Sequence, residues 1–246
     1  MRTEIEWFGQ STFKIHIDKQ VVLMDPWFNS NPVAPLKASE VGKVDVITVS
    51  HGHVDHFGDT MEIMGNSTAK LVCTPDISWY VDLRGFPRAS GRNLPLGHGG
   101  TINIDNVGIT MVKAVHPSAL YAEEWPVRRI YYPDGGAVGY VVTTADNVAI
   151  YHAGDTDIFM DMQLIGKRHD LDYALLPVGG RFTMDYKAAV DACDLLKPKA
   201  VIPIHYNTNP EITINIDDFV DLMSQRHPEI KVIVMKPGEK HCVREN

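Results

Sequence analysis

The segment SHGHVDHFGD, residues 50–59, concentrates side chains that bind metal ions. Its ligand-type residues are His51, His53, Asp55 and His56. Imidazole nitrogens and carboxylate oxygens are the ligands that zinc, manganese and iron accept from proteins, and Gly52 permits a tight turn between them. The alternative is a solvated polar turn, which is disfavoured because three of the chain's 11 histidines fall within six residues. Four ligands exceed what one open metal position takes, so the loop predicts two metal ions.

Three further ligand-type residues follow predicted strands. They are His116 after a strand expected over 109–115, Asp155 after one over 148–152, and His205 after one over 201–204. The histidine-rich loop itself follows a strand expected over 44–49. Open sheets bind ligands at the carboxyl ends of their strands. Four ligand groups at four strand ends therefore predict a metal centre.

Hydrophobic periodicity indicates which elements position these groups. The expected strands are 12–17, 21–24, 44–49, 71–73, 109–115, 139–143, 148–152, 173–176, 201–204 and 231–235. The expected helices are 59–64, 77–83, 158–166, 186–196 and 217–225. Asp59 and Glu62 predict a capping box at the start of the first helix. Strands followed by alternating strands and helices predict stacked sheets with helices outside, and no linker interrupts the chain, so we expect one domain over residues 1–246.

The order of these motifs resembles the metallo-β-lactamase superfamily. The residues that carry the resemblance are His51, His53, Asp55, His56, His116, Asp155 in the triplet GDT, and His205. The stretches IYHAGDTDIFMDMQLIG, ALLPVGGRFTMD and LLKPKAVIPIHYNT are similar to the superfamily's metal-dependent hydrolases akin to L-ascorbate-6-phosphate lactonases. The similarity runs over essentially the whole chain, from near Ile5 to KPGE at 236–239. It is specific for the superfamily and group but not for a substrate.

The resemblance implies an α/β fold, a four-layer αββα sandwich, and a metal-dependent hydrolase with a binuclear metal site. The implied ligands are His51, His53 and His116 for one metal ion, Asp55, His56 and His205 for the other, and Asp155 as the bridge. Two such cations activate a shared hydroxide, which Asp55 or Asp155, the catalytic candidates, would steer onto an ester, lactone or related bond. Zinc is the expected metal, and manganese is the alternative because of the lactonase kinship and the carboxylate content.

Two other functions stay open. One is a phosphodiesterase acting on a small phosphodiester; RNA is disfavoured because the chain has no spare substrate-gripping insertion and a net charge of −8. The other, from a different class, is a metal-binding interaction or sensor protein with little turnover. An intact ligand set weighs against the sensor.

Candidate substrate contacts lie just beyond the strand ends. They are Arg181, Tyr206 and Asn207. Arg181 suits a bidentate grip on a phosphate or carboxylate, and an ordinary surface arginine is the alternative. The aromatic and arginine-rich segment 121–134 follows His116 and is interpreted as a lid or rim loop, or as a partner interface.

Four other residues have candidate supporting roles. Asp25 either accepts the free N–H of a ligand histidine or only forms a turn before proline, and Asp59 either supports a ligand or caps a helix. We expect His152 to be buried and hydrogen-bonded rather than a ligand, and Thr156 to secure the turn after Asp155. Cys193 lacks a neighbouring base pattern, so we do not expect a nucleophilic thiol.

Composition sets the remaining limits. The 246 residues are 44% hydrophobic and 22% charged, typical of a globular protein. The longest apolar runs, such as 138–142, are too short to cross a bilayer, and the acidic balance argues against a nucleic-acid partner. Three cysteines and a start without an apolar leader predict a cytoplasmic location. We therefore expect a small-molecule substrate and no membrane partner; family analogy allows a homo-oligomer.

Overall fold

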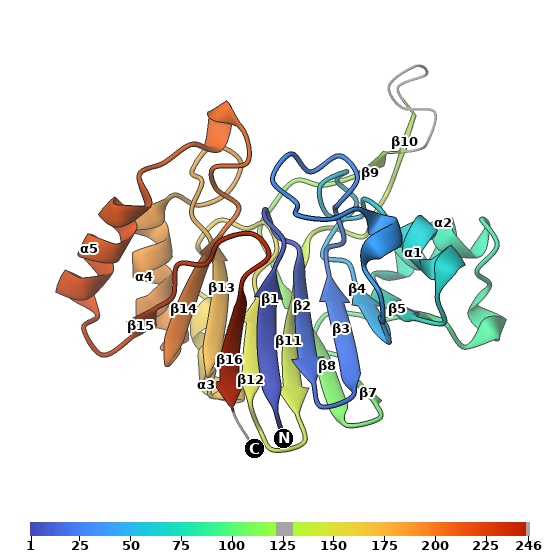
Figure 1. The fold of residues 1–246 in the computed structure, drawn as a ribbon, viewed down its shortest axis with the longest axis horizontal. Helices are drawn as coiled ribbons and strands as arrows, with labels where there is room; N and C mark the ends of the chain where they lie inside the picture. The colour runs from blue at the N-terminus through green and yellow to red at the C-terminus, as the bar shows by residue number, and fades with distance from the viewer. Residues whose placement is uncertain (122–129, 245–246) are drawn as a thin grey trace. The chain divides into compact units, whose positions relative to one another are not determined.

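The chain divides into two compact units. The computed structural model describes residues 1–121 and 130–244. Unit 1 comprises Met1–Gly97, Pro117–Ala137 and Lys236–Asn246, and unit 2 comprises His98–His116 and Val138–Met235. Each unit contains one seven-stranded mixed sheet with helices beside it (Figure 1), as alternating strands and helices require of an α/β chain. The expected single domain over residues 1–246 stays a prediction.

The sheet of unit 1 has the strand order β16-β1-β2-β3-β4-β5-β6. Its strands are β1 (Thr3–Trp7), β2 (Phe13–Ile17), β3 (Gln20–Met24), β4 (Val46–Thr48), β5 (Lys70–Cys73), β6 (Asn93–Pro95) and β16 (Lys240–Arg244). Pairing is antiparallel from β16 to β3 and parallel from β3 to β6. The loops that follow β3, β4 and β5 therefore leave the same edge of this sheet. A separate antiparallel pair joins β9 (Leu120–Tyr121) to β10 (Tyr131–Tyr132).

The helices of unit 1 cover an apolar face of this sheet. They are α1 (Thr60–Asn66), α2 (Pro75–Asp82) and the 3-10 turns η1 (Ala38–Glu40) and η2 (Arg88–Ser90). Leu23, Ile47 and Leu71 of β3, β4 and β5 are fully buried in one cluster with Ile63 and Ile77 of the two helices. This shared core fixes the helices against the parallel strands.

The sheet of unit 2 has the strand order β15-β14-β13-β12-β11-β8-β7. Its strands are β7 (Thr101–Ile104), β8 (Val107–Lys113), β11 (Val138–Thr144), β12 (Ala149–His152), β13 (Tyr173–Pro177), β14 (Ala200–Ile204) and β15 (Lys231–Val232). Strand β11 is antiparallel to both β8 and β12, and β12, β13 and β14 are parallel. Strands β8, β12 and β14 therefore run in one direction, and their carboxyl ends meet at one edge of the sheet.

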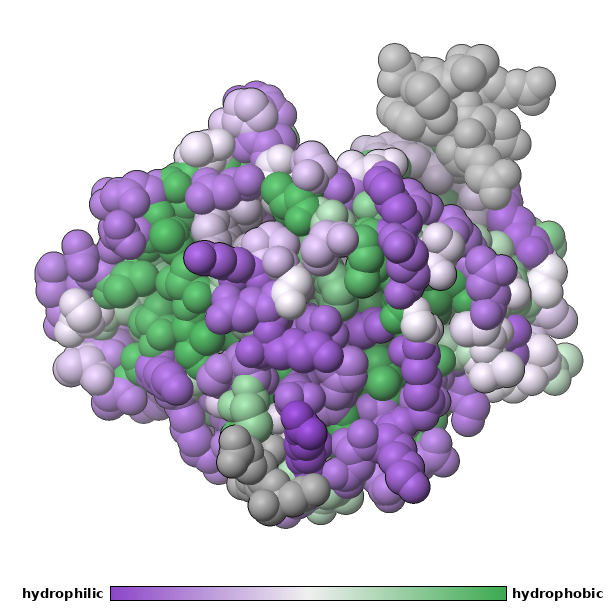
Figure 2. Space-filling model, in the orientation of Figure 1, coloured by the Kyte–Doolittle hydropathy of each residue, from purple (hydrophilic) through white to green (hydrophobic). Residues whose placement is uncertain are grey.

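Side chains cap the first turns of two long helices of unit 2, α4 (Tyr186–Leu196) and α5 (Ile216–Arg226). Unit 2 also contains α3 (Met162–His169) and the 3-10 turn η3 (Pro210–Ile212). The Asp185 carboxylate accepts from Ala188 N at the start of α4, and Asn215 does the same for Asp217 N at the start of α5. Figure 1 shows α4 and α5 outside β14, and Figure 2 shows apolar residues on the surface near α4, α5 and β15.

The expected helices and strands are found, with corrected ends. The strand expected over 109–115 ends at Lys113, and the last strand covers two residues rather than 231–235. The helix expected over 158–166 begins at Met162. The predicted capping box of α1 is wrong, because the Asp59 side chain makes no capping hydrogen bond. Within the described residues, no helix has the length and apolar character needed to cross a membrane.

The close approach of α3 to α4 depends on Gly166. A Cβ at this position would collide with the backbone carbonyl oxygen of Leu196. Gly65, on α1, is also a helical glycine, but a Cβ there would meet no atom within 4 Å. The first glycine is therefore required by packing, whereas the second only weakens its helix.

We predict opposite effects for alanine at these two glycines. Gly166→Ala should lower the free energy of unfolding by about 1–3 kcal/mol because α3 must move away from α4. Gly65→Ala should raise the free energy of unfolding by about 0.5–1 kcal/mol, since it removes only the entropy cost of glycine. Urea denaturation of the two variants measures both changes, and equal stability of the two variants would contradict the packing role of Gly166.

Candidate functional site

In unit 1, the histidine-rich loop leaves β4 next to the loop that leaves β3. The first loop carries Ser50 through His56, and the second begins with Asp25. Asp25 has a φ of 46°, a left-handed conformation that few residues other than glycine adopt. Its carboxylate is 1% exposed. A buried charge needs hydrogen-bond partners, and the neighbouring loop supplies them.

Three donors of the histidine-rich loop converge on Asp25. Oδ1 accepts from Ser50 N at 2.7 Å, and Oδ2 accepts from Ser50 Oγ at 2.6 Å and lies 2.7 Å from His56 Nδ1. A carboxylate accepts hydrogen bonds, so His56 donates from Nδ1 and its Nε2 lone pair is directed away from Asp25. The contact expected between Asp25 and a histidine of this loop is found at His56, while metal binding by His56 stays a prediction.

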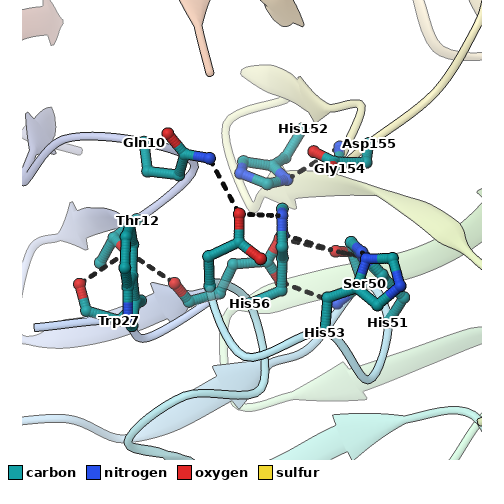
Figure 3. Close-up of polar contacts among 12 residues, drawn as sticks. Gln10, Thr12, Trp27, Ser50, His51, His53, His56, His152, Gly154 and Asp155 are labelled. Atoms are coloured by element: carbon teal, nitrogen blue, oxygen red, sulfur yellow. Dashed lines mark hydrogen bonds and ion pairs between the residues drawn. The ribbon is translucent and has the colours of Figure 1, made fainter. Parts of the chain in front are cut away.

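Ser50 fixes the tautomer of His51, as Asp25 fixes the tautomer of His56. Its hydroxyl donates to Asp25 and lies 3.0 Å from His51 Nδ1 (Figure 3). The hydroxyl oxygen therefore accepts from Nδ1, which leaves Nε2 of His51 as the basic nitrogen. Both histidines are fully buried, so their rings are held in one orientation and one tautomer.

The ligand-type atoms of this loop have the spacing of neighbours in a metal coordination sphere. Nε2 of His56 lies 3.6 Å from Oδ2 of Asp55; two ligands at tetrahedral zinc, with bonds of about 2.1 Å, are about 3.4 Å apart. Nε2 of His51 lies 2.9 Å from Nδ1 of His53, close to the roughly 3.0 Å of two such ligands at a right angle. The donor set of unit 1 therefore fits divalent cations.

Two residues that the sequence analysis did not identify position this loop. Gln10 donates from Nε2 to Oδ2 of Asp55 at 2.9 Å (Figure 3). The buried carboxylate of Asp134 accepts from Gly52 N at 2.8 Å. Gly52 must be glycine because a Cβ there would lie 2.5 Å from the Leu120 backbone. These contacts join residues far apart in sequence, so no local motif indicates them.

In unit 2, three ligand-type residues meet at the carboxyl ends of parallel strands. His116 follows β8, Asp155 follows β12 and His205 directly follows β14. Oδ2 of Asp155 lies 3.6 Å from Nε2 of His116 and 3.2 Å from Nε2 of His205. One carboxylate oxygen between two imidazoles at ligand-to-ligand spacing suits a shared metal ligand.

The turn that presents Asp155 is tied to the end of β8. The hydroxyl of Thr156 donates to Asp157 O at 2.6 Å and accepts from Val115 N at 2.9 Å. His152 is fully buried, and its Nδ1 accepts from Gly154 N at 3.2 Å (Figure 3). The turn contact expected of Thr156 and the buried, hydrogen-bonded placement expected of His152 are therefore found, and a role of His152 other than metal ligand stays a prediction.

The three predicted substrate contacts lie in different surroundings. Arg181 is exposed and pairs with Glu211 at 3.1 Å. Tyr206 is buried, and burial raises its pKa to about 12, so its phenol stays protonated at neutral pH. Asn207 has a φ of 55°, and its side-chain oxygen accepts from Ile214 N at 2.8 Å. Their roles toward a substrate stay predictions.

Other predicted residues are placed as follows. The Asp59 carboxylate accepts from Phe28 N at 2.6 Å and Asn29 N at 3.0 Å, so it braces the loop after β3. Most of the segment 121–134, interpreted as a lid, rim or interface, lies outside the described residues. Its first residue, Tyr121, stacks on His53 with ring centroids 5.6 Å apart.

Burial raises the pKa of Cys193 to about 12, so its thiol is not activated.

Comparison with known proteins identifies the family of this chain. The model of the beta-lactamase superfamily domain matches residues 4–205. A UPF0173 metal-dependent hydrolase from Archaeoglobus fulgidus is 37% identical over 238 residues, 97% of this chain and 98% of that relative. One from Sulfolobus acidocaldarius is 38% identical over 239 residues, 96% of this chain and 97% of the relative.

Solved structures support the same assignment. Igni18, a metallo hydrolase from the archaeon Ignicoccus hospitalis, has a TM-score of 0.87 at 31% identity, with both chains fully covered. An isothiocyanate hydrolase from Delia radicum gut bacteria has a TM-score of 0.70 at 16% identity, covering 97% of this chain and 98% of that one, and shows the fold alone.

The chain belongs to the metallo-β-lactamase superfamily. Within it, the protein is a metal-dependent hydrolase. The predicted family, the α/β fold class and the enzyme assignment are thereby confirmed.

We predict that Asp25→Asn weakens metal binding. The amide cannot supply the negative charge that orients His56 through Nδ1, so metal affinity should fall about 10–100-fold. Competition with a chromogenic chelator measures this change.

Asp45→Asn is the matched control. Asp45 lies just before the other end of β4 and accepts from Val21 N at 2.8 Å, without contact to the histidine-rich loop. Its metal affinity should equal that of the wild type. Equal affinities for the two variants would contradict the orienting role of Asp25.

Proposed function

We propose that the ligand groups of the two units act together as a binuclear centre. One divalent cation would be bound by His51, His53 and His116, and the other by Asp55, His56 and His205, with Asp155 between them. Membership of the superfamily and the ligand-like spacing inside each unit support this proposal. The observation that carries it is the single oxygen of Asp155 between His116 and His205.

The reaction we propose is hydrolysis of an ester or lactone bond in a small molecule. Bound divalent cations supply Lewis acidity and water of lowered pKa. The residues of the chain do the rest: Asp25 and Ser50 keep the ligand histidines in one tautomer, and Gln10 restrains Asp55. Zinc is the proposed metal because imidazoles dominate the donor set, and manganese is the alternative.

Substrate contacts belong to this proposal as well. Tyr206 directly follows His205, and its phenol hydroxyl would donate a hydrogen bond to an oxygen of the substrate. Arg181 would exchange its ion pair with Glu211 for an anionic group of the substrate. This exchange is possible because an exposed ion pair contributes little to the free energy of folding. Asn207 would contact the substrate only through its amide nitrogen, since its oxygen is used by Ile214.

The three cysteines, an odd and sparse count, support a cytoplasmic location.

Metal analysis combined with a substrate screen tests the proposal. Protein purified without added metal should contain about two equivalents of zinc or manganese, and His51→Ala/His205→Ala should lose them. The wild type should hydrolyse neutral aryl esters or lactones, and the double variant should lose at least about 10³-fold in rate.

Three results would contradict the proposal in different ways. Metal content unchanged in the double variant would show that these histidines are not ligands. Full metal content with no hydrolysis of esters, lactones or phosphodiesters would favour the sensor protein. Hydrolysis confined to phosphodiesters would favour the phosphodiesterase.

A further inference from the structure

A cavity of about 490 Å³ in unit 1 lies against the histidine-rich loop. Its volume lies within the range of small-molecule sites, about 300–1,000 Å³. Four aromatic residues line it: Trp27 from the loop after β3, Phe57 from the histidine-rich loop, Tyr80 from α2, and Tyr121 from β9. Aromatic side chains bind flat apolar groups through ring faces and edges.

The aromatic walls are held in place by their own contacts. The rings of Phe57 and Tyr80 meet edge to face, with centroids 5.8 Å apart and planes at 87°. The guanidinium of Arg84 lies 3.6 Å from the centre of the Tyr80 ring. A cavity with such fixed walls binds a ligand at a low cost in side-chain entropy.

Tyr121 connects this cavity to a metal ligand. It lines the cavity, and its ring is stacked on His53, with planes 8° apart. A group bound against Tyr121 therefore lies beside a ligand histidine. A substituent on that group can reach the histidine-rich loop, because Gly52 and Val54 of that loop also line the cavity.

Two polar groups of the cavity wall already have partners. Gly52 N donates to Asp134, and the carboxylate of Asp59 accepts from Phe28 N and Asn29 N. Among the described residues that line the cavity there is no lysine, arginine or histidine. An anionic group such as a phosphate would find no counter-charge on these walls, whereas a neutral ring would displace only water.

We propose that this cavity binds a flat aromatic group of the substrate and thereby selects aryl-substituted esters or lactones. The choice of bond rests on the proposed function, but the binding of the aromatic group does not. Met61, on the first turn of α1, also lines the cavity and is half-buried. It packs against the edge of the core of unit 1, and a larger side chain there would take up part of the cavity.

The binding test uses 2-naphthol as a neutral aromatic probe in calorimetric titration of the full-length protein, before and after metal removal with a chelator. Met61→Trp should weaken binding by at least about tenfold. The matched control is Met160→Trp, which replaces a 73% exposed methionine of unit 2 and should leave affinity unchanged. Decahydro-2-naphthol, the saturated analogue, should bind about tenfold more weakly than 2-naphthol because it cannot stack.

Equal affinities for Met61→Trp and Met160→Trp would overturn the proposal, and so would equal binding of the saturated and aromatic probes. Absence of naphthol binding to the wild type would also overturn it. The far-ultraviolet circular dichroism spectrum and the melting temperature of Met61→Trp should match those of the control, so that lost binding reports a filled cavity and not an unfolded protein.

The substrate test compares kcat/KM for 2-naphthyl acetate with kcat/KM for methyl acetate. Met61→Trp should lower the ratio of the two values by about tenfold, and Met160→Trp should not change it. An unchanged ratio would overturn the role in substrate selection. If the metal-loaded wild type hydrolyses neither ester while naphthol binding passes its test, the proposed function fails and the aromatic site stands.

Discussion

The buried carboxylate of Asp25 determines the conformation of the histidine-rich loop. A charge that is 1% exposed is stable only when donors surround it, and the donors that reach it come from Ser50 and His56. The left-handed backbone of Asp25 directs its side chain toward the end of β4. Because β3 and β4 are parallel neighbours, the loops that follow them leave the same end of the sheet. These loops are therefore close enough for the hydrogen bonds to form. The hydrogen bonds fix the loop, the ring of His56 and, through Ser50, the ring of His51.

Unit 2 also brings its ligand-type residues together, but by strand direction and not through a carboxylate like that of Asp25. Its three ligand-type residues depend on strand direction, because only strands that run the same way bring His116, Asp155 and His205 to one edge. His205 also has a positive φ of 55°, which costs free energy in a residue other than glycine. Such strain is retained where packing or function requires it, and here it occurs at the residue that contacts Asp155.

Much of this arrangement could be predicted from local sequence. Ligand-type residues in a glycine-containing loop and alternating hydrophobic strands are local signals, and both identified the correct segments. The helix ends were less predictable, since the same side chains have competing partners. Asp59 and Glu62 have the spacing of a capping box, yet Asp59 bonds to Phe28 N and Glu62 to Asn29 Nδ2. The tertiary contact is preferred over the local one.

The supporting residues could not be predicted because their partners are distant in sequence. Gln10 contacts Asp55 across 45 positions, and Asp134 contacts Gly52 across 82. The edge strand β16 pairs with β1 from the opposite end of the chain, and no local pattern indicates that pairing. The aromatic cavity is unpredicted for the same reason, because it combines Trp27, Phe57, Tyr80 and Tyr121 from four separate segments.

We propose that both units contribute ligands to one pair of metal ions. X-ray absorption spectroscopy of the metal-loaded protein tests it most directly. We expect nitrogen and oxygen neighbours at about 2.0–2.2 Å with imidazole scattering, together with a metal neighbour at about 3.5–4 Å. Sulfur ligands, or a spectrum of isolated metal ions without a metal neighbour, would contradict the account.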